Sequence, residues 1–118
     1  MPSKSFNSVK IFYPKWTKEG IIRLLKERLP RLHAVLPLVR VILFGSYAKG
    51  NFTAYSDIDL LVVDSGQPRD DAFALTKKIL ALRGLEPHLY TESEYHQHRE
   101  VIDRMTQDGI VLFTPSEK

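Results

Sequence analysis

The sequence contains no cysteine among its 118 residues. This absence excludes disulfide bonds, thiolate zinc sites and a cysteine nucleophile. A Gly-Lys-Ser/Thr sequence of the Walker type is also missing, and so is Gly-x-Gly-x-x-Gly. The phosphate-binding loops of P-loop and dinucleotide-binding proteins are therefore absent. Any phosphate site in this chain has to be built from other residues.

Long apolar runs are missing too. No run approaches the ~20 residues that a membrane-spanning helix needs, and the N-terminus lacks the long apolar segment of a signal peptide. We therefore expect a cytoplasmic protein without membrane contact. The formal net charge is a mild +3. This charge permits a nucleic-acid partner, but no cluster of lysine and arginine is dense enough to indicate one.

The composition is typical of one globular domain over residues 1–118. Hydrophobic residues make up 43% and charged residues 26%, which is ordinary for a soluble protein, and the length suffices for a single core. Residues 1–16 are expected to form an N-terminal arm, in which the alternation at 8–13 predicts a short strand.

Four strand-like stretches alternate with helical patterns, at residues 39–44, 55–63, 85–90 and 110–113. The first two are joined by only ten residues, which is too short for a parallel crossover. We therefore predict an α/β (α+β) fold with a mixed sheet of about four or five strands packed against helices. Pro87 donates no ladder hydrogen bond, so the third strand is expected to be at a sheet edge or to be short. Open sheet edges are compatible with a homodimer or a hetero-oligomer.

Three helices are expected between these strands. The first begins after Thr17 and is ended or kinked by Pro30. The second starts at Pro68 and stops near Gly84. The third begins with the capping-box spacing of residues 91–94, and it is predicted to bury Tyr95, Val101, Ile102 and Met105.

The most informative stretch is the core motif at residues 41–63. Gly45 and Ser46 form a turn after an apolar run. Ten residues separate Ser46 from Asp57, and Asp59 follows two positions later, at the start of a second apolar run. Residues two apart on a strand project from the same face, so both carboxylates are expected to point the same way, roughly 7 Å apart.

Two carboxylates in this position suit a divalent cation. Without a cation between them, neighbouring carboxylates repel each other and raise their own pKa values. Mg²⁺ usually takes one or two carboxylates, with phosphates completing its shell. Gly45 lets a phosphate chain approach the backbone, and the Ser46 hydroxyl and nearby N–H groups can bind its oxygens. The pattern predicts a site for a metal–nucleotide complex.

Two further residues of the motif have two interpretations each. Lys49 lies in the same turn and fits either a phosphate contact or an exposed, solubilising lysine. Ser56 fits either a residue that supports Asp57 through a hydrogen bond or the end of the loop. Both are retained as candidate phosphate-binding residues.

These residues resemble the signature of the polymerase-beta-like nucleotidyltransferases. That signature is an apolar residue, Gly-Gly or Gly-Ser, a spacer, and then Asp-x-Asp or Asp-x-Glu between apolar residues. Here it reads Leu-Phe-Gly-Ser at 43–46 and Ser-Asp-Ile-Asp-Leu at 56–60. The sequence of this motif is similar to that of the minimal nucleotidyltransferases, which are stand-alone bacterial and archaeal domains of about this size.

The resemblance implies an activity and a partner. Such an enzyme transfers a nucleoside monophosphate from a Mg²⁺ (or Mn²⁺) complex of a nucleoside triphosphate, here expected to be ATP, to a hydroxyl acceptor. Minimal domains of this group are often paired with a small helical protein of the HEPN class in toxin–antitoxin systems. The resemblance therefore points to an acceptor on such a partner protein.

The family also places a third carboxylate on the next strand, beside the equivalents of Asp57 and Asp59. Glu86 is the only carboxylate on the predicted strand 85–90, and it is assigned as the third metal ligand and catalytic group. His88 lies on the same face and is the alternative. A missing third carboxylate would leave a catalytically impaired module that binds a nucleotide or a partner.

The remaining histidines and the N-terminal aromatic residues point to structure more than to chemistry. His96 and His98 are two positions apart on a predicted helix and do not face each other, which disfavours a shared metal. His98 is expected at the boundary of the core and His33 at the surface. The aromatic residues of 12–16 fit core filling or a partner-facing patch.

Overall fold

The computed structural model describes residues 17–52 and 56–114. Its helices are α1 (Lys18–Val35), α2 (Ser46–Lys49), α3 (Ala72–Leu80), α4 (Glu92–Gln97) and α5 (Arg99–Met105). Its strands are β1 (Leu38–Phe44), β2 (Ile58–Asp64), β3 (Leu85–Thr91) and β4 (Ile110–Phe113). The strand predicted at 8–13 and the aromatic residues of 12–16 lie outside the described residues.

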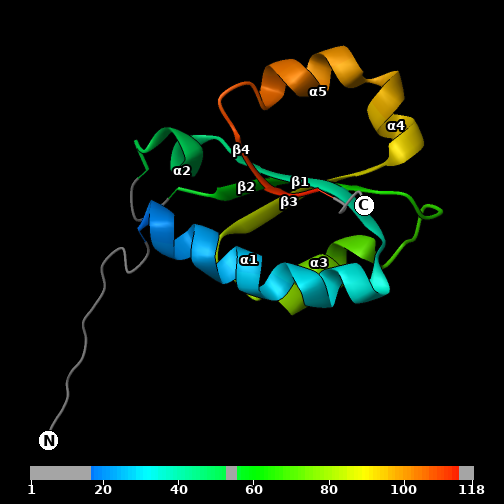
Figure 1. Cartoon of the computed structure of the whole chain (residues 1–118), viewed down its shortest axis with the longest axis horizontal. Helices are drawn as coiled ribbons and strands as arrows, with labels where there is room; N and C mark the ends of the chain where they lie inside the picture. The colour runs from blue at the N-terminus through cyan, green and yellow to red at the C-terminus, as the bar shows by residue number, and fades with distance from the viewer. Residues whose placement is uncertain (1–16, 53–55, 115–118) are drawn as a thin grey trace, which may run out of the picture.

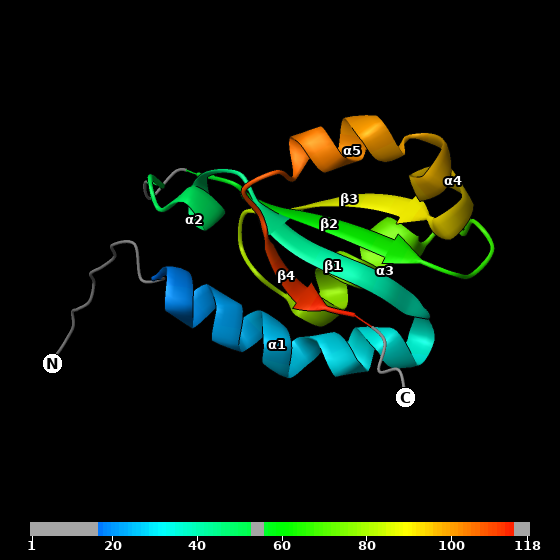
Figure 2. The ribbon, with the colours of Figure 1, turned by 45° about the horizontal axis from the view of Figure 1, so that its top comes forward.

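The described strands form one mixed sheet in the order β3-β2-β1-β4 (Figure 2). β1 is antiparallel to both β2 and β4, whereas β2 and β3 are parallel and are connected through α3. The predicted mixed sheet is therefore confirmed, and so is the edge position of β3, the strand that contains Pro87. The short link between β1 and β2 allows antiparallel pairing and includes the small helix α2.

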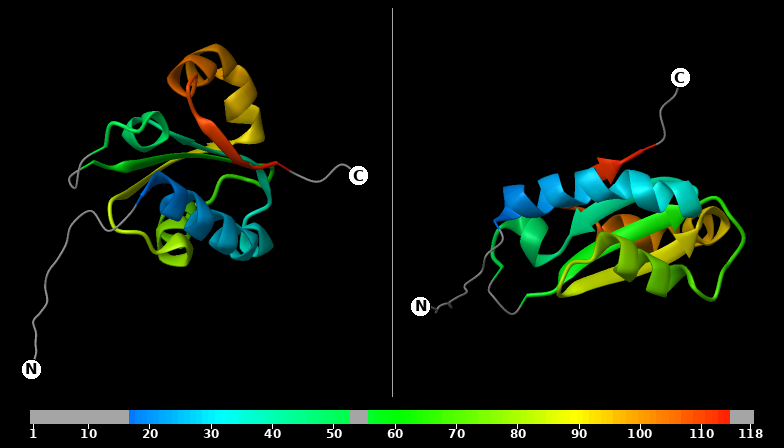
Figure 3. Two further views of the ribbon diagram at one scale, coloured as in Figure 1. Left: turned by 60° about the vertical axis from the view of Figure 1, so that its left-hand side comes forward. Right: turned by 90° about the horizontal axis from the view of Figure 1, so that it is seen from below.

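Helices cover both faces of this sheet, with α1 and α3 on one side and α4 and α5 on the other (Figure 1). Viewed from the helical side below, α1 and α3 lie next to each other (Figure 3). Because both faces are covered, alternate residues of β1 and β2 enter two separate cores. The core under α1 and α3 includes Val41, Leu43, Leu60 and Val62, and the core under α5 includes Ile42, Phe44, Leu61 and Val63.

Helix α1 contains Pro30, where an end or a kink was predicted. The helix does not end there but continues to Val35. Pro30 is on the exposed side, while Leu25, Leu29 and Leu32 on the other side are almost completely buried. Burial of this leucine stripe stabilises the helix beyond the hydrogen bond that proline removes. No helix in the described part of the chain is both long and apolar enough to cross a membrane.

Helix α3 begins later than predicted, at Ala72 rather than at Pro68. Arg69 occupies the approach to the helix. Its guanidinium group donates hydrogen bonds to both carboxylate oxygens of Asp71, at 2.9 Å, and to the carbonyl of Val35 on α1, at 3.0 Å. These contacts hold the segment before Ala72 in a non-helical conformation.

The helix predicted after Thr91 is two helices. The capping box is confirmed, because the Thr91 hydroxyl accepts from the Glu94 N–H and the Glu94 carboxylate accepts from the Thr91 N–H. The chain then breaks at His98, which separates α4 from α5. In α5, Ile102 is buried, whereas Val101 is 59% exposed and was wrongly predicted to be buried. Consecutive residues of a helix point about 100° apart, so the two side chains do not share the buried face.

Candidate active site

Asp59 lies at the centre of the candidate site. It is the second residue of β2, and its Cα partners are Phe44 at the end of antiparallel β1 and Glu86 near the start of parallel β3. The three strands therefore meet at one end of the sheet, close to α2 (Figure 1). The side chain of Asp59 is 28% exposed, so its carboxylate is accessible while its surroundings are largely protein.

Gly45 packs directly against this carboxylate. Its backbone has φ +78° and ψ −151°, a combination that is essentially restricted to glycine. A Cβ atom at this position would lie 2.5 Å from Oδ2 and 3.3 Å from Cγ of Asp59. The glycine therefore provides space for the carboxylate, and the bend faces Asp59, as the motif at 41–63 predicts.

His88 contacts Asp59 from β3. Its Nε2 atom lies 3.4 Å from the Asp59 Oδ1 atom, which is a long hydrogen bond. The imidazole ring also packs against the ring of Phe44, with a centroid distance of 5.2 Å. His88 is the register partner of Leu61, two residues after Asp59, so it reaches the carboxylate diagonally across the parallel pair.

The other two predicted acids are more open to solvent. Asp57 is exposed and precedes β2 by one residue. Glu86 is exposed on β3, directly beside Asp59 in the register, so their Cα atoms are ~4.8 Å apart. Glu86 and His88 lie on the same face of the strand as Asp59, because β2 and β3 are paired in parallel.

The phosphate-binding candidates surround the same bend. Ser46 and Lys49 are the first and last residues of α2, and Gly50, at φ +85°, ends the helix. Ser46 is half-buried and Lys49 is exposed. Ser56 is half-buried just before Asp57. The structure thus brings Gly45 and His88 against the carboxylate of Asp59. Glu86 is beside Asp59 in the strand register, and Ser46, Lys49, Ser56 and Asp57 are near these residues in the chain.

The protein atoms alone do not form a closed metal cage. Within residues 17–52 and 56–114, no three histidine, aspartate or glutamate side chains are grouped closely enough to hold a metal ion. The available donors are nevertheless carboxylate oxygens, the ligands that Mg²⁺ prefers, and Mg²⁺ is usually bound by one or two carboxylates together with substrate phosphates. These donors therefore fit an ion that is coordinated partly by protein carboxylates and partly by the phosphates of a triphosphate.

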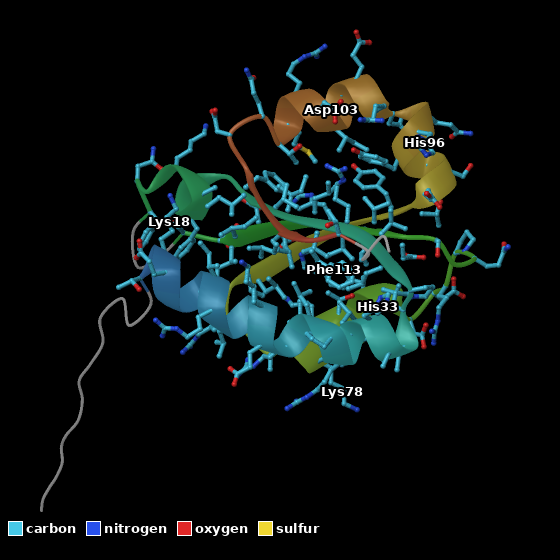
Figure 4. The ribbon with its side chains drawn as sticks, in the orientation of Figure 1. Lys18, His33, Lys78, His96, Asp103 and Phe113 are labelled. Carbon is cyan, nitrogen blue, oxygen red and sulfur yellow. The ribbon has the colours of Figure 1, made fainter. Side chains whose placement is uncertain are left out.

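The other histidines are remote from this group or bound to backbone. His96 and His98 are exposed, so the prediction that His98 lies at the core boundary is wrong. His98 is the residue between α4 and α5 and lies in neither helix. His33 is at the surface, as predicted, and its Nδ1 accepts a hydrogen bond from the N–H of Leu38. Its ring packs against Phe113 (Figure 4).

The opposite end of β2 contains two hollows of about 600 and 220 Å³, which share Pro68, Thr91 and Glu94. The smaller one is lined by Asp64, which is 5% exposed and accepts a hydrogen bond from the Gly66 N–H. Burial raises the pKa of Asp64. Five residues of strand, about 17 Å, separate Asp64 from Asp59, so these hollows are separate from the candidate active site.

Comparison with known proteins shows the family of the chain. The family model of the nucleotidyltransferase domain matches residues 21–111. The chain is 35% identical over 82 residues to the "Putative protein adenylyltransferase MJ0604" of Methanocaldococcus jannaschii, which covers 63% of this chain and 77% of the relative.

Solved structures have the same fold. One is the crystal structure of a "putative nucleotidyltransferase" from Sulfolobus solfataricus, with a TM-score of 0.55 and 25% identity over 82% of this chain and 83% of that chain. Another is a toxin–antitoxin crystal structure with AMP-PNP, with a TM-score of 0.52 and 23% identity over 86% of this chain and 76% of that chain. The second likeness shows the fold alone. Because the family model matches most of the sequence, this chain belongs to the nucleotidyltransferase domain family.

Proposed function

We propose that this protein transfers AMP from ATP to a hydroxyl group of a protein acceptor. The observation that carries the proposal is the Asp59 carboxylate, which lies between the Gly45 bend and β3, where three strands meet. An accessible carboxylate beside a bend without a side chain leaves room for the phosphates of a nucleotide and for the cation that accompanies them.

Asp57 and Asp59 are proposed to hold Mg²⁺ or Mn²⁺, with Glu86 as the third carboxylate. The bound cation would neutralise the charge that develops on the phosphate and on the leaving pyrophosphate. The chain itself supplies fewer ligands than such an ion needs. We therefore expect tight metal binding only in the presence of nucleotide.

The transfer is a displacement at the α-phosphorus of ATP. The acceptor oxygen forms a new bond to this phosphorus, the bond from the phosphorus to the α,β-bridging oxygen breaks, and pyrophosphate leaves. We propose that the acceptor proton passes to the carboxylate of Glu86, which is exposed and is the register partner of Asp59. The Ser46 hydroxyl, the N–H groups at the start of α2 and Lys49 are proposed to bind the phosphates, because the first N–H groups of a helix have no intrahelical acceptor. Ser56 is proposed to assist beside Asp57.

A protein acceptor is supported by the relatives. The similar protein of Methanocaldococcus jannaschii bears the name of a protein adenylyltransferase, and a structural neighbour is a toxin–antitoxin complex with an ATP analogue. Together with the resemblance of the motif at 41–63 to the minimal nucleotidyltransferases, this supports a small helical protein of the HEPN class as the partner that brings the hydroxyl. We also propose the cytoplasm as the location of the pair.

The test is incubation with ATP labelled at the α-phosphate, Mg²⁺ and a candidate HEPN protein. We expect label on the acceptor with the wild type and at least a hundredfold less with Asp57→Asn/Asp59→Asn, in line with the ~10²-fold or greater losses on removal of charge-stabilising groups. The matched control is Asp103→Asn, which removes an exposed carboxylate of α5. Equal labelling by wild type and double variant would refute the assignment.

The second candidate function is a module of the same fold that binds a nucleotide without transferring it. It is favoured by one observation, that the described acids and histidines do not form a cluster of three. Calorimetry with Mg²⁺ and ATP separates the two functions. Binding without product over long incubation would support the module, and turnover would exclude it.

A further inference from the structure

We infer that His88 is a positioning residue, which holds the Asp59 carboxylate in one orientation from the side opposite to Gly45. The inference rests on the proposed function, because it concerns how the active-site carboxylate is presented to a metal–nucleotide complex. It assigns to His88 neither the role of a metal ligand nor that of a base.

The two carboxylate oxygens of Asp59 have different neighbours. Oδ1 is the oxygen within 3.4 Å of the His88 Nε2 atom. Oδ2 is the oxygen that a Cβ on Gly45 would approach to 2.5 Å. The carboxylate is therefore bounded on both sides, by a hydrogen-bonding ring on β3 and by a backbone bend after β1. Rotation of the carboxylate about the side-chain bonds of Asp59 would break the hydrogen bond to His88 or push an oxygen against the Gly45 backbone.

His88 is itself held in place. Its ring packs against Phe44 at 5.2 Å, with an interplanar angle of 57°, and its side chain is 35% exposed. The neighbouring Pro87 is buried and Leu89 packs against the core under α1 and α3. The other face of this strand is thus packed against the core. The backbone of His88 is therefore held in place while its imidazole contacts Asp59.

The geometry disfavours the two other roles for this histidine. A neutral imidazole carries a proton on one nitrogen and a lone pair on the other. When Nε2 donates its proton to Asp59, that nitrogen has no lone pair for a metal ion or for an acceptor proton. A hydrogen bond to a metal-binding carboxylate instead fixes the orientation of the ligand, and loss of such a partner typically reduces metal affinity or activity by about 10- to 100-fold.

The test compares His88→Ala with His88→Gln. The glutamine amide nitrogen reaches about as far from the backbone as Nε2 and can donate a hydrogen bond to Asp59, but it has no basic lone pair at neutral pH. We expect His88→Ala to lower kcat by about 10- to 100-fold and to weaken calorimetric binding of Mn²⁺ with a non-hydrolysable ATP analogue. His88→Gln should restore most of both. His98→Ala, which removes an exposed histidine, is the matched control and should resemble the wild type.

Two results would overturn the inference. If His88→Ala retains wild-type kcat and Mn²⁺–nucleotide affinity, the histidine does not position Asp59. If His88→Gln is as defective as His88→Ala, the ring acts as a base or a ligand instead. Failure of the proposed function looks different. If the wild type binds Mn²⁺–nucleotide but transfers no AMP, the proposed reaction is refuted. Calorimetry of the two variants still decides the role of His88 in that case. A wild type that binds no Mn²⁺–nucleotide refutes both.

Discussion

Replacement of Gly45 by alanine tests the contact on which the site depends. The added Cβ would lie 2.5 Å from the Asp59 Oδ2 atom, closer than non-bonded atoms approach. The carboxylate has to move, because the other neighbours of the new Cβ belong to the same side chain. In addition, alanine is strained at φ +78° and ψ −151°, which costs about 1–3 kcal/mol.

Gly50→Ala is the matched control for this strain. Gly50 ends the same helix at φ +85° and ψ 7°, but a Cβ there meets no atom within 4 Å. A left-handed alanine costs about 1–2 kcal/mol. Both variants should therefore lose stability, by about 4 °C in Tm for each kcal/mol in a domain of this size.

The two variants should differ in activity. We expect Gly50→Ala to keep its Mn²⁺–nucleotide affinity and its AMP transfer at a temperature where it is folded. Gly45→Ala should lose transfer by at least tenfold, because the displaced carboxylate of Asp59 no longer meets the metal in its productive geometry. Thermal unfolding, calorimetry and label transfer measure these quantities. If Gly45→Ala transfers AMP as fast as Gly50→Ala does, transfer does not depend on the contact between Gly45 and Asp59.

Two further predictions concern stability. Burial raises the pKa of Asp64, so the folded state binds the proton more tightly than the unfolded state does, and stability gained from this group increases as the pH falls through the folded pKa. Asp64→Asn should therefore raise Tm at pH 7, and the gain should vanish in acid; an unchanged difference from pH 7 to pH 3 would contradict it. Arg28 on α1 donates hydrogen bonds at 2.6 Å and 3.2 Å to the carbonyls of Leu80 and Ala81 at the end of α3. Arg28→Ala should cost about 1–2 kcal/mol in chemical denaturation, whereas Lys26→Ala on the exposed side should cost almost nothing.

Much of the fold could be predicted because its signals are local. The continuous apolar runs of the motif at 41–63 predicted two strands, and the structure has β1 and β2 there, with alternate residues in two cores. The Thr17 cap of α1 and the capping box at Thr91 depend on neighbours three residues away. Such patterns are visible in a sequence because the interacting groups are close along the chain.

Other features depended on contacts between distant segments. The helix continues past Pro30 because its leucine stripe is buried against the sheet. The break at His98 separates α4 from α5, and α5 packs over the second core with Ile102 buried and Val101 exposed. Neither effect has a local signal, since both depend on what the rest of the protein presents to the helix.

For the candidate site, the chemical types can be found in the sequence alone: a glycine bend, two aspartates at strand spacing, and a glutamate and a histidine on one face of a later strand. The tertiary structure decided which of them touch. Antiparallel pairing of β1 with β2 brings Gly45 to Asp59, and parallel pairing of β2 with β3 brings His88 to the same carboxylate. Strand order and register are set by burial across the whole sheet, and a sequence motif does not encode them locally.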